Sequence, residues 1–293
     1  MAEVPVKHMK AHSPIVLENE RSEGLEKVKN DTGAWGFFKY LYGRSALKFL
    51  ALNLLMLLFA AAIYVVLLIF SNKLASALAA LPYSNSFGLG AAPWGGMDAY
   101  IASVTSAFTT ERALWLSLAV PFVALSLSGG FAALRNAYWT GKLKVIKPFF
   151  RGIKQTFLQI FPFTVLISGG LLGVHYVTLA TSGWAAIVLQ IVLYLILALL
   201  AIWTLVFAGV VTLYKQSFLQ SVKSASALFV RYAVSNIFSF VLACAMFALL
   251  AINFWIVSAL ALALVVMFGM VFAGLVWMIH MINICGQTQA ENQ

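Results

Sequence analysis

Charged residues are scarce in this chain. Asp, Glu, Lys and Arg make up only 10% of its 293 residues, against about 25% in a typical soluble domain. Hydrophobic residues make up 62% of the chain, and the mean hydropathy is +0.94. A water-facing surface cannot be built from so few charges, so the composition excludes a soluble globular domain and indicates a membrane protein.

Cysteine is scarce, and no cleavable leader is expected. The chain has only two cysteines, Cys244 and Cys285, which argues against a disulfide-built secreted domain. The first 31 residues contain no short apolar segment followed by a small-residue cleavage site. We therefore expect two free thiols and a first membrane span that itself directs insertion.

Long apolar runs dominate the rest of the chain. Because a span needs about 20 consecutive apolar residues, we predict an all-α, polytopic membrane helix bundle in a single domain, residues 34–293. Six transmembrane helices are predicted, at residues 49–71, 113–134, 157–181, 184–212, 233–252 and 255–283. The last two form one apolar run that is too long for a single crossing, so we divide it by a tight hairpin near residues 251–254.

The basic residues orient this topology. Seventeen of the nineteen Lys and Arg residues precede the first span or fall in the second-to-third and fourth-to-fifth connections, and only Lys73 and Arg112 fall on the other side. By the positive-inside rule, both termini are predicted to be cytoplasmic, in a multi-pass protein of the cell membrane. The cations flank spans, where they meet anionic headgroups, so nucleic acid is not expected as a partner despite the net charge of +10.

Three segments lie outside the predicted spans on the amino-terminal side of the chain. Residues 1–33 are polar and mixed in charge, which predicts a disordered cytoplasmic tail. Residues 34–48 predict an amphipathic helix at the inner interface. Residues 72–112 form the largest outer segment, and its apolar content favours packing against the bundle as a cap, with a substrate lid as the alternative.

Two inner connections predict further amphipathic helices. The first starts at Pro148, a residue suited to a first helical turn, and the second lies before the fifth span. Either they lie at the membrane interface, or they dock a partner protein. The candidate docking residues are Phe149, Phe150, Arg151, Ile153, Lys154, Phe157, Lys215, Phe218 and Lys223.

Groups that carry chemistry are sparse inside the predicted spans. No Asp, Glu, Lys or Arg lies within them, which disfavours a proton- or sodium-coupled pump. His175 and His280 are predicted near opposite membrane surfaces, where hydrogen-bonded structural roles fit better than a shared metal site. Asn53 and Asn236 are intramembrane amides that predict interhelical hydrogen bonds, and Pro121 predicts a kink in the second span. We therefore expect no enzyme activity, no cofactor and no bound metal.

Several motifs resemble the YesL-like family of small bacterial membrane proteins. They are Pro121, then Ser128-Gly129-Gly130-Phe131-Ala132-Ala133-Leu134, then Gly141-Lys142, and then Phe149-Phe150-Arg151-Gly152-Ile153-Lys154-Gln155-Thr156-Phe157. The chain departs from the family pattern by an outer insertion at residues 72–112 and by Gly130-Phe131-Ala132 in place of Pro-Ala-Thr. The resemblance implies an accessory role beside carbohydrate-uptake ABC transporters.

Two functions follow as hypotheses. The first is an accessory or permease-like subunit associated with carbohydrate transport, whose partners are the lipid bilayer and a membrane or cytosolic transporter subunit. The alternative is a self-contained carrier or channel for a small neutral solute. A membrane enzyme is disfavoured because no nucleophile–base pair and no set of metal ligands is visible.

Overall fold

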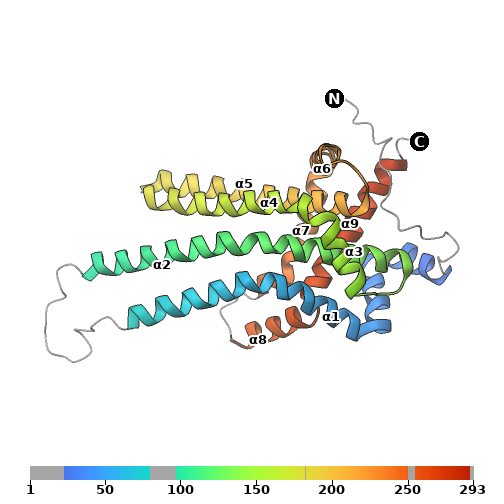
Figure 1. Cartoon of the computed structure of the whole chain (residues 1–293), viewed down its shortest axis with the longest axis horizontal. Coiled ribbons are helices and arrows are strands. Elements are labelled where there is room, and N and C mark those ends of the chain that lie inside the picture. Colours follow the sequence, from blue (N-terminus) through green and yellow to red (C-terminus); the bar gives the residue numbers. More distant parts are fainter. Residues whose placement is uncertain (1–22, 80–96, 182, 250–254, 291–293) are drawn as a thin grey trace. The chain divides into compact units, whose positions relative to one another are not determined.

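The computed structural model describes residues 23–79, 97–181, 183–249 and 255–290, and over these residues all regular structure is helical (Figure 1). The helices are α1 (Glu23–Ala79), α2 (Met97–Ala119), α3 (Val123–Thr140), α4 (Ile146–Ala180), α5 (Gly183–Leu213), α6 (Phe218–Arg231), α7 (Ala233–Ala248), α8 (Trp255–Leu264) and α9 (Met270–Ala290). A 3₁₀ turn, η3 (Val120–Phe122), separates α2 from α3, and a π-helical segment, η5 (Val265–Gly269), separates α8 from α9.

The helices confirm the expected class of protein. The described residues contain five helices that are long and apolar enough to cross a membrane, or six if α6 and α7, which meet at 91°, are counted as one span. Many large apolar side chains are exposed along them, including Trp184, Ile187 and Leu195 on α5. Such a surface is stable only against lipid or another protein.

The chain divides into two compact units. Unit 1 comprises Met1–Phe59, Val123–Thr164 and Ala198–Gln293, and unit 2 comprises Ala60–Phe122 and Val165–Leu197. Helices α1, α4 and α5 each contribute residues to both units.

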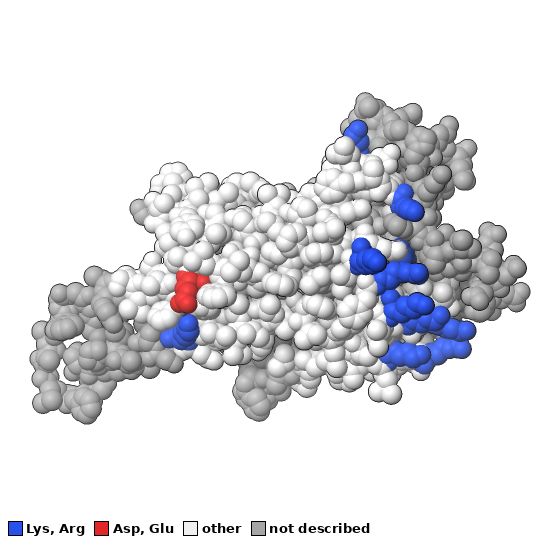
Figure 2. Space-filling view, in the orientation of Figure 1, with Lys and Arg blue, Asp and Glu red and all other residues white. Residues whose placement is uncertain are grey.

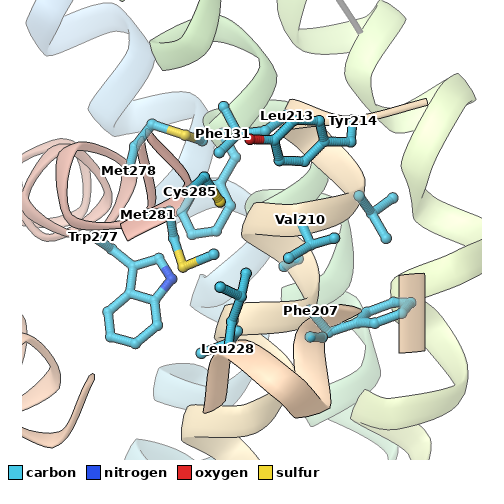
Figure 3. Close-up of a cluster of buried hydrophobic side chains, with 14 of the residues drawn as sticks. Phe131, Phe207, Val210, Leu213, Tyr214, Leu228, Trp277, Met278, Met281 and Cys285 are labelled. Carbon is cyan, nitrogen blue, oxygen red and sulfur yellow. The ribbon is translucent and has the colours of Figure 1, made fainter. Parts of the chain in front are cut away.

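Unit 1 has an aromatic core. In Figure 3, Phe131 of α3, Phe207 of α5 and Trp277 of α9 belong to one cluster of buried side chains, joined by Met281 and by Leu228 of α6. The indole N–H of Trp277 donates to the Leu205 carbonyl at 3.0 Å, which satisfies its polar atom inside the core. Helix α9 therefore packs inside unit 1, against α3 and α7.

Two of the sequence motifs pack against each other in unit 1. The ring of Phe149 lies where a side chain at Gly129 would be, since a Cβ built there would lie 2.6 Å from the ring. Likewise, a Cβ on Gly152 would lie 2.5 Å from the carbonyl oxygen of Ser128. The glycines of α3 and α4 thus allow the two helices to approach closely at their crossing.

Unit 2 is built from the last part of α1, all of α2 with the turn η3, and the adjoining halves of α4 and α5. Helices α4 and α5 run side by side (Figure 1), with Leu197 filling the space beside Gly170. Lys73 of α1 and Glu111 of α2 form an ion pair at 3.5 Å, and both side chains are about half exposed.

Several predicted boundaries need correction. The second span, predicted over residues 113–134, belongs to helical structure over 102–140, and the third, predicted over 157–181, begins at Ile146 as part of α4. The segment after Pro148 is therefore not a separate interfacial helix. Sequence hydropathy ended each span at the first basic residues, but a helix continues through them because long cationic side chains can reach the interface.

The amino-terminal and outer segments also differ from their predictions. Residues 23–33, predicted as disordered, form the first turns of α1, whereas residues 1–22 lie outside the described part of the chain. In the outer segment, residues 72–79 and 97–112 are helical, and 80–96 are not described. The hairpin predicted at residues 251–254 falls in the undescribed range 250–254.

Candidate functional site

The predicted docking residues on α4 divide into an inward and an outward group. Phe149 is fully buried in the unit 1 core and stacks on Phe59 with ring centroids 5.9 Å apart, and Ile153 and Phe157 are partly buried against the same unit. Phe149 therefore cannot contribute to a docking surface. Sequence periodicity identified the apolar face of this helix correctly, but it could not distinguish lipid from protein as the material that covers it.

The outward group on α4 consists of Phe150, which is 53% exposed, and the exposed cations Arg151 and Lys154. These three side chains are available to lipid headgroups or to a partner.

Helix α6 is the second predicted docking element, and in the structure it is a short helix that ends at Arg231, before α7. It is 14 residues long, and it turns by 91° into α7. The backbone N–H of Ser217, just before the helix, donates to the Gln220 side chain at 3.3 Å, a local hydrogen bond that favours helix initiation.

One face of α6 is held by the protein. Ser221, Ala225 and Leu228 are buried against the unit 1 core, and Phe218 stacks on Phe163 with centroids 5.8 Å apart. The opposite face is open, as shown by the exposed side chains of Leu219, Lys223 and Val230. These three residues recur at spacings of four and seven, so they form one stripe along the helix.

The exposed cations of unit 1 form a basic surface, visible as the blue side chains gathered at one end of this unit in Figure 2. We define the basic surface as Arg44, Lys48, Lys142, Lys144, Lys147, Arg151, Lys154, Lys215 and Lys223. Among the residues of unit 1 whose side chains the structure describes, there is no Asp or Glu to neutralise them. The surface is therefore complementary to anions.

Arg135 is a functional candidate that sequence reasoning missed. It was assigned to a connection just beyond the second span, but it lies inside α3 and is only 8% exposed. Its Nη1 donates to the backbone carbonyl of Thr212 near the end of α5. Hydropathy could not find it, because an arginine at the end of an apolar run is more often exposed than buried.

Asn53 is bonded to the backbone of another helix. Its Nδ2 donates to the carbonyls of Val265 and Val266 at 2.9 and 2.7 Å, and its Oδ1 accepts from the Val271 N–H at 3.1 Å. These backbone groups belong to the π-helical segment η5 and to the start of α9, where the α-helical hydrogen-bond pattern is interrupted. The Asn53 amide, which was predicted to join helices, thus supplies hydrogen-bond partners to backbone groups at a local interruption of another helix.

A small apolar cavity adjoins this contact. Its volume is about 110 Å³, and its lining includes Met56, one turn after Asn53, as well as Met270 and Gly274 of α9. Cavities of this size and polarity accept a few heavy atoms at most, because a benzene-binding protein cavity measures about 150 Å³.

Asn236 forms the second intramembrane amide contact. Its Oδ1 lies 2.8 Å from Nε2 of His280, and its Nδ2 donates to the Leu228 carbonyl at 3.3 Å. The other predicted structural histidine, His175, lies in unit 2 with its Nε2 3.0 Å from the Thr110 hydroxyl. Within the described residues, no group of three His, Cys, Asp or Glu side chains is arranged to hold a metal ion.

Pro121 lies in the 3₁₀ turn that separates α2 from α3. Proline has no N–H to donate, so the carbonyl of Ser117, four residues earlier, lacks its usual helical partner. The Ser168 hydroxyl of α4 donates to this carbonyl instead. The carbonyl left free at this helix break therefore accepts a hydrogen bond that joins α2 to α4.

No protein-family model, no curated protein and no solved structure matches this chain. The resemblance to the YesL-like family therefore stays a prediction that rests on the sequence motifs.

Proposed function

We propose that this protein is an accessory or permease-like subunit of a membrane transport system, and that its outward stripe on α6 and the adjacent cations dock an acidic partner protein in the cytoplasm. The single observation that carries the proposal is the division of α6 into a face buried by its own core and an open face that combines Leu219 and Val230 with Lys223. The two apolar side chains are 70% and 73% exposed.

The charge distribution supports a protein partner of acidic character. The basic surface has no described carboxylate within unit 1, so an acidic partner would gain electrostatic attraction and correct orientation. The positive-inside rule assigns the same surface to the cytoplasm. The link to carbohydrate transport comes from the family resemblance alone.

Photocrosslinking in native membranes tests the docking role. A photoreactive amino acid replaces Leu219 on α6 or, as the control, Trp184 of unit 2, another exposed large apolar residue. The proposal predicts one protein adduct of defined mass at Leu219, none of that mass at Trp184, and its loss in the K215E/K223E variant. Lipid adducts alone at Leu219, or a protein adduct that survives charge reversal, would refute docking.

A second candidate function is a carrier or channel for a small neutral solute. The observation that favours it is the interrupted helix beside the apolar cavity, since transporters place irregular backbone where it lines a cavity. The cavity of about 110 Å³ is far below the roughly 300 Å³ of the smallest usual ligand pockets, so a sugar could enter only after the helices around Asn53 separate.

Uptake by liposomes distinguishes this candidate from docking. Purified protein in liposomes is supplied with radiolabelled neutral solutes, with Asn53→Leu as the variant and empty liposomes as the control. Uptake by the wild type alone would support the carrier. Equal uptake by empty liposomes would exclude transport of those solutes by the isolated protein.

A further inference from the structure

Arg135 is a buried cation whose charge cannot be removed. It is 8% exposed and lies five residues before Thr140, the last residue of α3. A guanidinium stays protonated at every pH that proteins encounter. Burial of such a charge is costly unless an opposite charge and hydrogen bonds offset it.

The chain offsets this charge only in part. Nη1 of Arg135 donates to the Thr212 carbonyl, which is one of the unpaired acceptors at the end of α5 and carries part of the negative end of its dipole, about half a charge. The Nε–H is buried and makes no hydrogen bond to any residue that the structure describes, and the Thr212 hydroxyl is in the same state. Two buried donors at this site therefore have no acceptor among the described residues.

The nearest charge increases the imbalance. Arg151 of α4 precedes Gly152, where a Cβ would lie 2.3 Å from the Cβ of Ala132, about one turn before Arg135 in α3. The two cations therefore lie at one crossing of α3 and α4, where their charges repel each other. No carboxylate is present among the described side chains of unit 1. The acidic residues elsewhere in the sequence are Asp98 and Glu111 of unit 2, six within residues 1–31, and Glu291.

We propose that Arg135 and Arg151 together bind one phosphoryl group, supplied by the headgroup of an anionic lipid. Paired guanidinium groups present planar N–H donors that match the oxygens of a phosphate, and an anion between them turns their repulsion into attraction. Arg135 lies about 7.5 Å from the end of α3, from five residues at 1.5 Å each. This end carries the basic surface, whose cations are suited to the headgroup layer.

A lipid in this place would also be structural. Its phosphate would bridge α3 and α4 next to the end of α5, the three helices that meet at Arg135, Arg151 and Thr212. Its acyl chains would cover exposed apolar side chains of the spans. This site is distinct from the stripe on α6, because neither arginine lies on that helix, although Arg151 also belongs to the basic surface.

Thermal unfolding of the purified full-length protein in detergent tests the site. Wild type is compared with R135Q, R135K and R151Q, and with K144Q as a control that removes an exposed cation of the same surface. Each protein receives dioleoyl phosphatidylglycerol, dioleoylglycerol (the same chains without phosphate), or inorganic phosphate.

The proposal predicts that phosphatidylglycerol raises the Tm of wild type and K144Q by about 5 °C, while dioleoylglycerol does not. R135Q should lose this rise, and R151Q, which removes an exposed side chain, should need about fivefold more lipid. If inorganic phosphate alone gives the full rise in Tm, the two arginines do bind a phosphoryl group, and that group comes from soluble phosphate and not from a lipid.

Two results would overturn the proposal. One is a wild-type Tm that responds to neither phosphatidylglycerol nor phosphate, because the charge is then neutralised within the chain. The other is an equal response in wild type and the arginine variants. If R135Q does not fold, R135K and R151Q decide the matter. R135K keeps a positive charge at residue 135, and R151Q changes only an exposed side chain, so both should fold and show a weakened Tm response to phosphatidylglycerol.

Discussion

The side-chain oxygen of Asn53 accepts a hydrogen bond from the backbone N–H of Val271 at 3.1 Å. In the same contact the amide nitrogen of Asn53 donates to two carbonyls of the π-helical segment η5. One buried side chain therefore satisfies three backbone groups at an interruption of another helix, which is how a helix break can persist where water does not reach.

Asn53→Ala should destabilise the protein by about 2 kcal/mol, because it removes three hydrogen bonds and leaves buried backbone groups without partners. Equilibrium unfolding in mixed detergent measures the change. The exposed neighbour Leu54 supplies the control, and Leu54→Ala should change stability by less than about 0.5 kcal/mol. Equal effects of the two substitutions would show that the π-helical segment does not need Asn53.

Gly152→Ala should destabilise the crossing of α3 and α4 by about 2 kcal/mol, because the new Cβ would lie 2.5 Å from the Ser128 carbonyl oxygen. Gly169→Ala is the matched control in the same helix, since a Cβ at Gly169 meets nothing within 4 Å. The control should be neutral or slightly stabilising, as alanine favours helix over glycine by up to about 1 kcal/mol. A tolerated Gly152→Ala would contradict the close approach.

Ser168→Ala should cost about 1 kcal/mol in wild type, because the Ser117 carbonyl loses the donor that replaces the missing Pro121 N–H. The same substitution should cost less in a Pro121→Ala background, where residue 121 can donate its own N–H. A double-mutant cycle measures this coupling. Additive effects would mean that Ser168 does not act through the carbonyl that Pro121 leaves free.

Orientation in the membrane is tested by labelling single cysteines in a variant that lacks Cys244 and Cys285. Because the basic surface is predicted to face the cytoplasm, an impermeant thiol reagent added outside should label a cysteine at Thr181, the exposed residue after α4. It should not label one at Lys144 in intact cells, although lysis should expose that position. The opposite pattern would reverse the topology.

The candidate site was only partly predictable. The charges of Arg151, Lys154, Lys215 and Lys223 were identified from the sequence, because basic residues beside apolar runs have few other environments available. The role of Phe149 was not, since the pattern that places an aromatic on a helix face is the same whether lipid or a glycine of another helix covers it. Asn53 was recognised as a helix-joining amide, but its backbone partners lie more than 200 positions away in the chain.

The sequence by itself determined that this is an all-helical protein with several membrane-length helices, because hydropathy and helix length are sums over neighbouring residues and need no knowledge of the fold. Tertiary structure decided which side chains are buried. It buried Arg135 against the end of α5, fitted Phe149 against Gly129, and joined Asn53 to η5. Each of these outcomes depends on which helix lies opposite, a property that distant segments determine together and that a local pattern does not contain.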